Sequence, residues 1–443
     1  MCASLAAPPL RNALCYSHRP ALRCLCRMNA ATTSLRHDAE VIGLVGLAHG
    51  TSHFFHLMLP PLFPWLMRDF SLSYTEAGVL MTVFFVVSAI GQALAGFVVD
   101  RVGARPVMFF GIATLATSGI VLGLADSYAM LALTAAVAGL GNSVFHPADF
   151  TLLNHRVTPT RLGHAFSVHG LSGNLGWAAA PLFMAGIAAA AGWHVAGFAA
   201  AAVGFTVLAV LVLRRNMLGT AARAVVAQPE SANPVPADQQ LGFLRSGAVW
   251  LCFCFFLLTT GAVGILQTYA PAILSEVYSV ALVFATGSLT AYLLGGAAGM
   301  IFGGFLAARS EHNERLIAGA LGLSAATALA LATGAVAVWM LLPLMVVLGF
   351  GVGVAGPNRD LLVRRAATSR FGKRAFGRVY GFVYSGADAG FAAAPLLVGP
   401  LLDAGHFSAA LLAVAGLQVA ALATAWRVGG AARALRTQEG HAA

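Results

Sequence analysis

Residues 139–147 read GLGNSVFHP, and residues 349–357, located 210 positions later, read GFGVGVAGP. Two further matches keep the same order: GFVVDR at 96–101 with GFLAAR at 304–309, and GNLGWAAAPL at 173–182 with ADAGFAAAPL at 387–396. Three matches in one order indicate that the chain is built from two homologous halves.

The amino-acid composition indicates the solvent in which these halves fold. Hydrophobic residues make up 59% of the 443 residues and charged residues only 9%. So few charges cannot give a soluble protein of this size a polar surface. We therefore expect lipid to be the solvent for most of the chain.

Apolar stretches long enough to cross a bilayer, about 20 residues each, recur along the whole chain. We expect twelve, with no charged loop between the ninth and tenth: 41–66, 76–99, 107–125, 129–153, 164–190, 194–213, 247–273, 279–307, 315–337, 338–362, 379–402 and 406–426. The predicted fold class is an all-α membrane protein with twelve transmembrane helices in two pseudo-symmetric six-helix bundles. An even number of spans places both termini on one side of the membrane.

The basic residues predict which side that is, because Lys and Arg concentrate in cytoplasmic loops. With cytoplasmic termini, 24 of the 26 Lys and Arg residues lie in the tails and the cytoplasmic loops. The exceptions are Arg68, in the first external loop, and Arg359, inside a span. The net charge of +10 therefore reflects membrane orientation rather than nucleic-acid binding. We expect a multi-pass protein of the bacterial cytoplasmic membrane with both termini in the cytoplasm.

Composition also divides the chain. We expect a disordered cytoplasmic tail at 1–40, a six-helix bundle at 41–213, a flexible linker at 214–246, a second bundle at 247–427 and a cytoplasmic tail at 428–443. In the first tail, Cys2, Cys15, Cys24 and Cys26 lack the regular spacing of a metal site. Met28 is an alternative start, and a targeting peptide is the other interpretation of this segment. Cys252 and Cys254 fall in the seventh span as packing residues.

The loop after the second span carries a recognisable pattern. Gly96, Asp100, Arg101, Gly103 and Arg105 resemble the signature loop of the major facilitator superfamily, although position 104 is Ala where a basic residue is common. The run SVFHP at 143–147, followed by a glycine-rich fifth span, resembles the fosmidomycin-resistance type of efflux carrier within that superfamily. The likeness extends over residues 41–427. It implies a substrate path between the halves near the midplane, exposed alternately to each side.

The resemblance implies a role for the signature loop. Asp100 would engage the N-terminus of the eleventh span in the other half and so latch the outward-facing state. In the second repeat Ala308 replaces this Asp, so that copy lacks the latch. The alternative is that Arg101 and Arg105 only obey the positive-inside rule.

Three histidines follow one face of the first span. His49, His53 and His56 are spaced i, i+4 and i+7, so they share a helical face that should line the cavity. An imidazole titrates near neutral pH and can accept a coupling proton or contact an anionic ligand. Alternatively, these rings only donate hydrogen bonds to neighbouring helices. No carboxylate lies in the same span, so we do not expect a metal site.

The fourth span combines a proline with two titratable residues. Pro147 should kink the helix, and His146 and Asp149 share a face. Arg359 occupies the position in the tenth span that is equivalent to Asp149, so the two can form a cytoplasmic gate or a proton-sensitive pair. In the alternative interpretation, Arg359 pairs with Asp360 or extends to the membrane interface.

The fifth and eleventh spans add His169, Asn174, Tyr384 and Asp388 to the candidate pathway. Asn174 and Asp388 are equivalent repeat positions, and Asp388 is either a second proton carrier or a packing residue. Glycines at 170, 173 and 176, and at 295, 299 and 303, indicate close helix packing rather than ligand loops.

No nucleotide-binding loop or nucleophile motif occurs in the sequence, so the energy must come, without a cofactor, from an ion gradient, most simply of protons, or from the substrate's own gradient. We expect a monomeric secondary transporter rather than an enzyme, with proton-coupled efflux of a small amphipathic or anionic molecule. Its partners would be that substrate and the lipid bilayer, with no nucleic acid. The alternatives are uptake of a small organic acid, and a non-transporting membrane sensor with the same fold.

Overall fold

The computed structural model describes the backbone of residues 20–219, 242–310, 313–371 and 376–442. Within these ranges only the backbone is described at 20–34, 242, 243, 248, 308, 359–371, 376–381 and 428–442. All regular secondary structure in the described ranges is helical.

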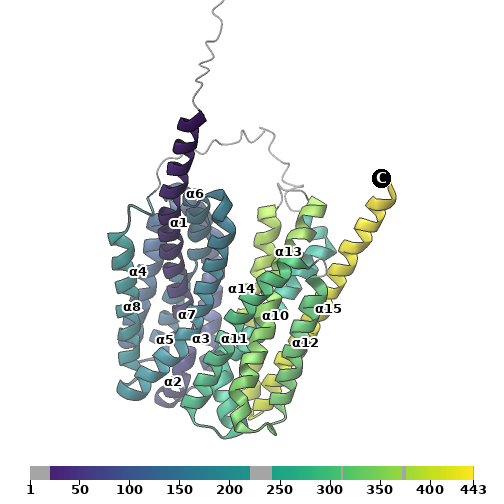
Figure 1. Ribbon diagram of the computed structural model, residues 1–443. Helices are drawn as coiled ribbons and strands as arrows, with labels where there is room; N and C mark the ends of the chain where they lie inside the picture. The colour runs from purple at the N-terminus through teal and green to yellow at the C-terminus, as the bar shows by residue number, and fades with distance from the viewer. Residues whose placement is uncertain (1–19, 220–241, 311–312, 372–375, 443) are drawn as a thin grey trace, which may run out of the picture.

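The helices form two bundles side by side (Figure 1). The first contains α1 (Pro20–His56), α2 (Phe63–Phe70), α3 (Tyr74–Val102), α4 (Ala104–Gly123), α5 (Tyr128–Asn142), α6 (Phe145–Arg156), α7 (Leu162–Ala191) and α8 (Trp193–Leu213). The second contains α10 (Gly247–Tyr278), α11 (Leu282–Arg309), α12 (Asn313–Ala332), α13 (Leu341–Phe371), α14 (Phe376–Asp403) and α15 (Phe407–Ala442). Short 3-10 turns lie at Pro60–Leu62, Pro159–Arg161, Gly242–Arg245 and Val338–Met340.

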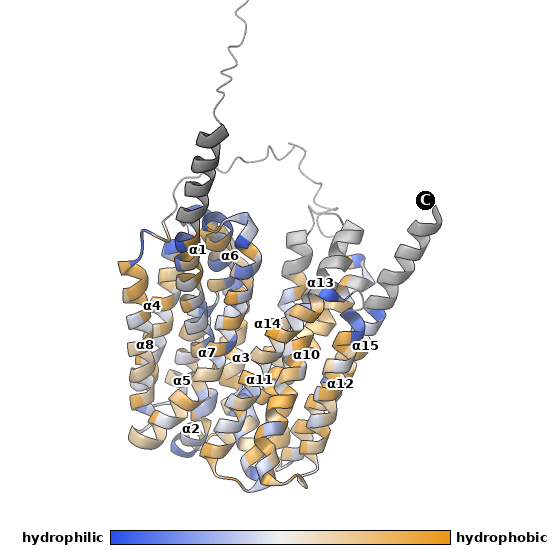
Figure 2. Ribbon diagram, viewed as in Figure 1, coloured by the Kyte–Doolittle hydropathy of each residue, from blue (hydrophilic) through white to orange (hydrophobic). Residues whose placement is uncertain are grey.

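Eleven helical stretches in the described residues are long and apolar enough to cross a membrane, with α5 and α6 forming one of them. The remaining expected span, α1, packs inside the first bundle against α7 and α6, and its histidines reduce its hydropathy. Figure 2 shows hydrophobic residues along both bundles and hydrophilic ones gathered toward their ends. Large apolar side chains such as Phe97 and Trp339 remain exposed on the outside, as a lipid-facing surface requires.

The fourth span is broken, as Pro147 predicts. Helix α5 ends at Asn142 and α6 begins at Phe145, so the break comes one turn before the proline. Pro147 lacks the amide hydrogen that would bond to the carbonyl of Ser143. The equivalent Pro357 lies inside the continuous helix α13, so the two repeats differ here.

The predicted N-terminal tail overlaps the start of α1. Residues 1–19 lie outside the described range, and α1 begins at Pro20, so the extent of disorder within residues 1–40 stays a prediction. The end of this segment makes a packing contact that the composition does not reveal. Asp38 is 2% exposed, and its Oδ2 accepts a hydrogen bond from Nη1 of Arg161 at 2.7 Å. Most of the predicted linker, residues 220–241, lies outside the described range. Its start is fixed, because Nη1 of Arg214 lies 2.6 Å from Oε1 of Glu40.

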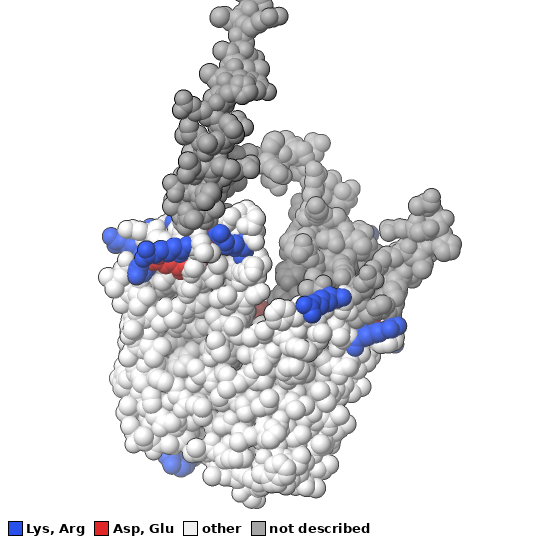
Figure 3. Space-filling model, in the orientation of Figure 1, with Lys and Arg blue, Asp and Glu red and all other residues white. Residues whose placement is uncertain are grey.

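The start of α1 and the end of α15 lie at one end of the molecule, here called the termini face (Figure 1). Most of the Lys and Arg residues visible in Figure 3 gather at this face, and the space-filling view is hollowed between the bundles there. The bundles meet through two helix pairs, α3 with α14 and α7 with α11. The molecule is therefore open between its halves at the termini face.

The opposite face is closed by contacts between the two halves. Asp403, at the end of α14, accepts hydrogen bonds from the backbone amides of Tyr74 at 2.6 Å and Thr75 at 3.1 Å. These amides are the unpaired N–H groups of the first turn of α3, where a carboxylate is favoured. The hydroxyl of Tyr269 on α10 donates to the carbonyl of Tyr74 at 2.9 Å. We call Asp403, Tyr269 and the first turn of α3 the closed end.

Candidate functional site

A buried carboxylate lies between two imidazoles in the first bundle. Oδ2 of Asp149, on α6, is 3.2 Å from Nδ1 of His49 on α1 and 3.1 Å from Nε2 of His169 on α7. Asp149 is fully buried, and the rings of His49 and His169 stack with centroids 3.5 Å apart. An enclosed carboxylate with two imidazole neighbours can take up and release a proton within a site shielded from lipid.

Glycines allow α1 and α7 to come this close. A Cβ on Gly176 would overlap the carbonyl of Gly50, so the two backbones touch at this level. One turn earlier, a Cβ on Gly173 would lie 2.8 Å from Nδ1 of His53 and 3.0 Å from Nε2 of His49. Gly173 therefore leaves room for imidazole rings, whereas Gly176 sets the distance between the helices.

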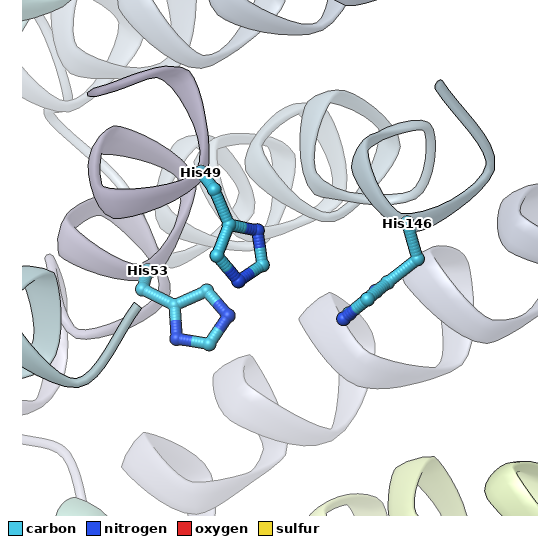
Figure 4. Close-up of side chains that lie close together, drawn as sticks. All are labelled: His49, His53 and His146. Carbon is cyan, nitrogen blue, oxygen red and sulfur yellow. The ribbon is translucent and has the colours of Figure 1, made fainter. Parts of the chain in front are cut away.

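Two more histidines extend the cluster. The ring of His53 lies 4.4 Å from that of His49, and the ring of His146 lies 5.5 Å from it, centroid to centroid. His53 and His146 are partly exposed, whereas His49 is buried. Figure 4 shows the three rings projecting from α1 and α6 toward a shared space. Two groups of side chains could hold a metal ion, because their ligand atoms lie within 4.8 Å of one another. One group is His49, His53 and His146, and the other is His49, Asp149 and His169.

A glutamine connects this cluster to the second bundle. Oε1 of Gln92, on α3, lies 3.0 Å from Nδ1 of His146, and Nε2 of Gln92 donates to Oδ2 of Asp388, on α14, at 3.5 Å. Sequence reasoning missed Gln92, although a lone amide in the apolar stretch 76–99 is a usable signal. The polar path thus crosses between the halves through α3 and α14.

His56 has aromatic surroundings instead. It accepts a hydrogen bond from Nε1 of Trp177 at 3.2 Å, and rings of both bundles surround it. The ring of Phe85, on α3, stacks on that of Phe391, on α14, at 4.7 Å. Trp177 and Phe391 are equivalent positions of the repeated motif, which the sequence shows, but their meeting around His56 depends on tertiary packing. Of the three α1 histidines, His56 therefore lies among aromatic rings, and it accepts a hydrogen bond where the alternative interpretation expected it to donate one.

The other two candidates from α7 and α14 lie elsewhere. The amide of Asn174 donates to the carbonyl of Gly170 at 3.0 Å and lies 3.5 Å from the sulfur of Met300 on α11. The ring of Tyr384 packs on Phe256 of α10 at 4.6 Å. Asn174 thus faces the other bundle, whereas Tyr384 packs within its own.

The predicted gate between Asp149 and Arg359 stays a prediction. The side chain of Arg359 lies outside the described residues, and the described ion-pair contacts of Asp149 are with His49 and His169 of its own half. In the signature loop, Asp100 and Arg101 are exposed, and Asp100 makes no hydrogen bond or ion pair with any described residue. Its role as a latch stays a prediction for a state that closes at the termini face.

The rest of the signature loop has identifiable structural roles. Gly103 joins α3 to α4 with φ of 89°, a backbone conformation that favours glycine, and a Cβ on Gly96 would meet no atom within 4 Å. Nη1 of Arg105 donates to the carbonyl of Arg215 at 3.4 Å, which ties the loop to the start of the linker.

Comparison with known proteins decides the family. The family model described as Major Facilitator Superfamily matches residues 45–370, well over half of the chain. The chain belongs to the major facilitator superfamily. The signature loop and the two repeated bundles are therefore family features, and the fold predicted from the sequence is confirmed.

Relatives within the superfamily have different named roles. The chain is 26% identical over 280 residues to the fosmidomycin resistance protein of Escherichia coli (strain K12), covering 62% of this chain and 66% of that one, just under two thirds. It is 27% identical over 369 residues to the membrane sensor protein UhpC of the same organism, covering 78% and 81%.

A solved structure of the superfamily shares the fold. A bacterial homologue of the human lysosomal transporter Spinster, in an inward-facing and unoccupied conformation, superposes with a TM-score of 0.72. The superposition covers 89% of this chain and 98% of that one at 16% identity. At this identity, the likeness establishes the fold alone.

Proposed function

We propose that this protein is a proton-coupled secondary transporter that exports a small amphipathic or anionic molecule by alternating access. The observation that carries the proposal is the buried Asp149 between His49 and His169. His146, on the same helix as Asp149, connects through Gln92 to Asp388 of the second bundle. Titratable groups buried in a transmembrane bundle typically mark ion or proton pathways. No nucleotide is needed, since the proton gradient provides the energy.

The open and closed ends support alternating access. The halves part at the termini face and meet at Asp403 on the opposite face. With Lys and Arg gathered at the termini face, we assign that face to the cytoplasm. The described conformation is then inward-open, and its closed end is external. The transporter works as a monomer in the bacterial cytoplasmic membrane, since one chain supplies both halves of the path.

Coupling follows from the position of Asp149. A proton on the carboxylate would weaken its charge-assisted contacts with His49 and His169 and free α6 to move relative to α1 and α7. Gln92 carries that change toward Asp388, because it contacts both His146 and the second bundle. The cluster thus links proton binding to the relative position of the halves.

The substrate class is inferred from the side chains around the histidine cluster and from the similar proteins. The partly exposed rings of His53 and Trp177, 4.3 Å apart, offer a polar and an apolar surface side by side, as an amphipathic or anionic molecule needs. Efflux is favoured by the SVFHP motif and by the similarity to the fosmidomycin resistance protein. Uptake of a small organic acid is the alternative direction.

A proton-release assay tests the proposal. The purified protein in weakly buffered detergent solution is mixed with fosmidomycin, drug-like amphiphiles and small organic acids, and the pH change is recorded. We expect one ligand class to release protons from the wild type and not from Asp149→Asn, while binding to both. Asp126→Asn, an exposed carboxylate outside the cluster, serves as the matched control. Ligand binding with unchanged proton release in Asp149→Asn would remove Asp149 from the coupling mechanism.

A sensor is the second candidate function, because the UhpC match covers 81% of that protein. Most of the length of a protein named as a sensor therefore aligns with this chain, so a sensor role would not depend on a separate soluble domain in this chain. Reconstitution into liposomes separates the two: a transporter moves the ligand found in the binding screen across the bilayer, whereas a sensor binds it without net flux.

A further inference from the structure

The histidine cluster has the composition and geometry of a metal site. We propose that His49, His53 and His146 bind a divalent transition-metal ion of the zinc class. One ring nitrogen from each lies within 4.8 Å of the others, and all three project into the shared space of Figure 4. In a tetrahedral Zn²⁺ site with Zn–N bonds of about 2.0–2.1 Å the nitrogens are roughly 3.4 Å apart, so small ring rotations close the group. Neutral imidazoles are the ligands that Zn²⁺, Ni²⁺ and Cu²⁺ favour.

The hydrogen bond to Gln92 prepares His146 as a ligand. Oε1 of Gln92 only accepts hydrogen bonds, so Nδ1 of His146, 3.0 Å away, carries the proton. In the neutral ring, Nε2 then has a free lone pair. The second amide contact, from Nε2 of Gln92 to Asp388, fixes the orientation of the glutamine. Metal-binding histidines usually donate their other N–H in this way.

Asp149 lies close enough to His49 to orient its ring by charge. Its Oδ2 lies 3.2 Å from Nδ1 of His49, the carboxylate–histidine arrangement that orients a ligand ring. His169 holds Asp149 from the other side, with Nε2 at 3.1 Å. The group formed by His49, Asp149 and His169 already has a hydrogen bond within it, so we assign it to orientation rather than to the ion.

An unsatisfied polar atom also points to a ligand. Nδ1 of His53 is buried and has no hydrogen-bond partner among the described residues. Burial of a polar group without a hydrogen-bond partner destabilises the fold by roughly 1–3 kcal/mol. A bound ion removes this cost when the nitrogen becomes a ligand, or when the ring reorients around the ion. Gly173 keeps space free beside the rings of His53 and His49, since a Cβ there would lie within 3.0 Å of them.

The ion has a route to the group, because His53 and His146 are partly exposed. Three protein ligands leave one tetrahedral position open, as in zinc sites that exchange a ligand. His56 does not belong to the group: its Nδ1 accepts from Trp177 and its ring lies among aromatic side chains. It is therefore a matched control on the same helix.

Equilibrium binding tests the site without any transport. The full-length protein in detergent is stripped with a chelator and titrated with Zn²⁺ in competition with a chromophoric chelator. The variants are His146→Asn, His53→Ala and Gln92→Leu, with His56→Gln as the control. His146→Asn keeps an N–H donor toward Gln92 but has no equivalent of Nε2. The six cysteines are present in every variant, so the readout is the difference from the wild type.

We expect His146→Asn and His53→Ala to bind one equivalent of Zn²⁺ fewer than the wild type, and His56→Gln to match it. Gln92→Leu should weaken the affinity about tenfold, the lower end for an outer-shell partner. Equal Zn²⁺ uptake by the wild type and both ligand variants would overturn the proposal. So would an equal loss in His56→Gln. Size-exclusion profiles of the metal-free variants verify folding, and the result is independent of whether Asp149 couples protons to transport.

Discussion

The two halves use the same helix pair for different purposes. The pairs α1–α7 and α10–α14 both cross at a glycine: Gly176 meets the carbonyl of Gly50, and Gly390 meets the carbonyl of Leu257. Aligned on these contacts and on the repeated motif, Phe256, Thr260 and Val383 of the second half correspond to His49, His53 and His169 of the first. Duplication kept the helix crossing, and the titratable cluster belongs to one half only.

This difference assigns roles to the halves. Phe256 and Val383 are buried apolar residues, and Oγ1 of Thr260 donates to the carbonyl of Ala387 at 2.9 Å. At these equivalent positions the second half thus has two apolar side chains and one hydrogen-bonded hydroxyl, and it contributes Asp388 at its edge. We infer that the first half binds the proton and the second half moves against it.

The largest effect should come from giving the first half a residue of the second. In His49→Phe, Asp149 keeps only His169, and a buried carboxylate that loses a partner of this kind is destabilised in its charged form by roughly 3 kcal/mol. We expect ligand-driven proton release to fall about 100-fold. Phe256→Leu is the control at the equivalent position of the second half, and it should keep ligand-driven proton release within about threefold of the wild type. Comparable losses in both variants would mean that the halves do not differ in this role.

An exchange between Gly173 and its repeat counterpart Ala387 should have the next largest effect. In Gly173→Ala, the new Cβ would lie within 3.0 Å of His49 and His53, and overpacking of this kind costs about 1–3 kcal/mol. In Ala387→Gly, no ring has to move, and the expected cost is about 1 kcal/mol from helix propensity. Unfolding in mixed micelles measures both. A larger cost for Ala387→Gly would contradict the view that Gly173 reserves space for imidazoles.

The closed and open ends extend the comparison to the two faces. Asp403 binds the N-terminus of α3 at the closed end, whereas Asp100, at the other end of α3, is exposed. Asp403→Asn should favour opening of this end by roughly 1 kcal/mol, because the carboxylate loses its charge at a helix N-terminus. Spin labels at Asp126 and Thr333, placed in a cysteine-free background, report the separation. Asp100→Asn should leave this distance distribution unchanged in the inward-open state, and an equal response would remove the distinction between the ends.

The smallest effect concerns two aspartates at opposite ends of the first half. Burial raises the pKa of Asp38, but hydrogen bonds from Thr158 and Arg161 outweigh it and hold that pKa below its ordinary value. Hydrogen bonds from Trp193 and Arg68 likewise lower the pKa of Asp69.

A lowered pKa means that the ionised aspartate stabilises the fold above its ordinary pKa and that this contribution is lost as the pH falls through the lowered value. Asp38→Asn should cost about 1 kcal/mol at neutral pH, and Asp69→Asn less, because the Asp69 side chain is 34% exposed. Thermal unfolding from neutral to acidic pH measures both. The difference between each variant and the wild type should shrink as the pH falls, and a constant difference would refute the assignment.

Much of the site was visible in the sequence as residues but not as an arrangement. The i, i+4, i+7 spacing placed His49, His53 and His56 on one face, but it did not separate His56, which Trp177 and aromatic rings enclose, from the other two. The expectation of no metal site rested on the lack of a carboxylate within the same span. Asp149 comes instead from α6, a separate helix whose position depends on the break before Pro147.

The sequence by itself determined the membrane class and the two six-helix halves, and it predicted a shared face for both termini. These properties depend on hydropathy, charge and repetition, which are additive along the chain. Tertiary structure alone decided that Asp149 lies between His49 and His169, that Gln92 joins the halves and that Asp403 closes one end. Those contacts connect residues 20 to 329 positions apart. Helix packing sets such distances to within an ångström, and no local sequence pattern encodes them.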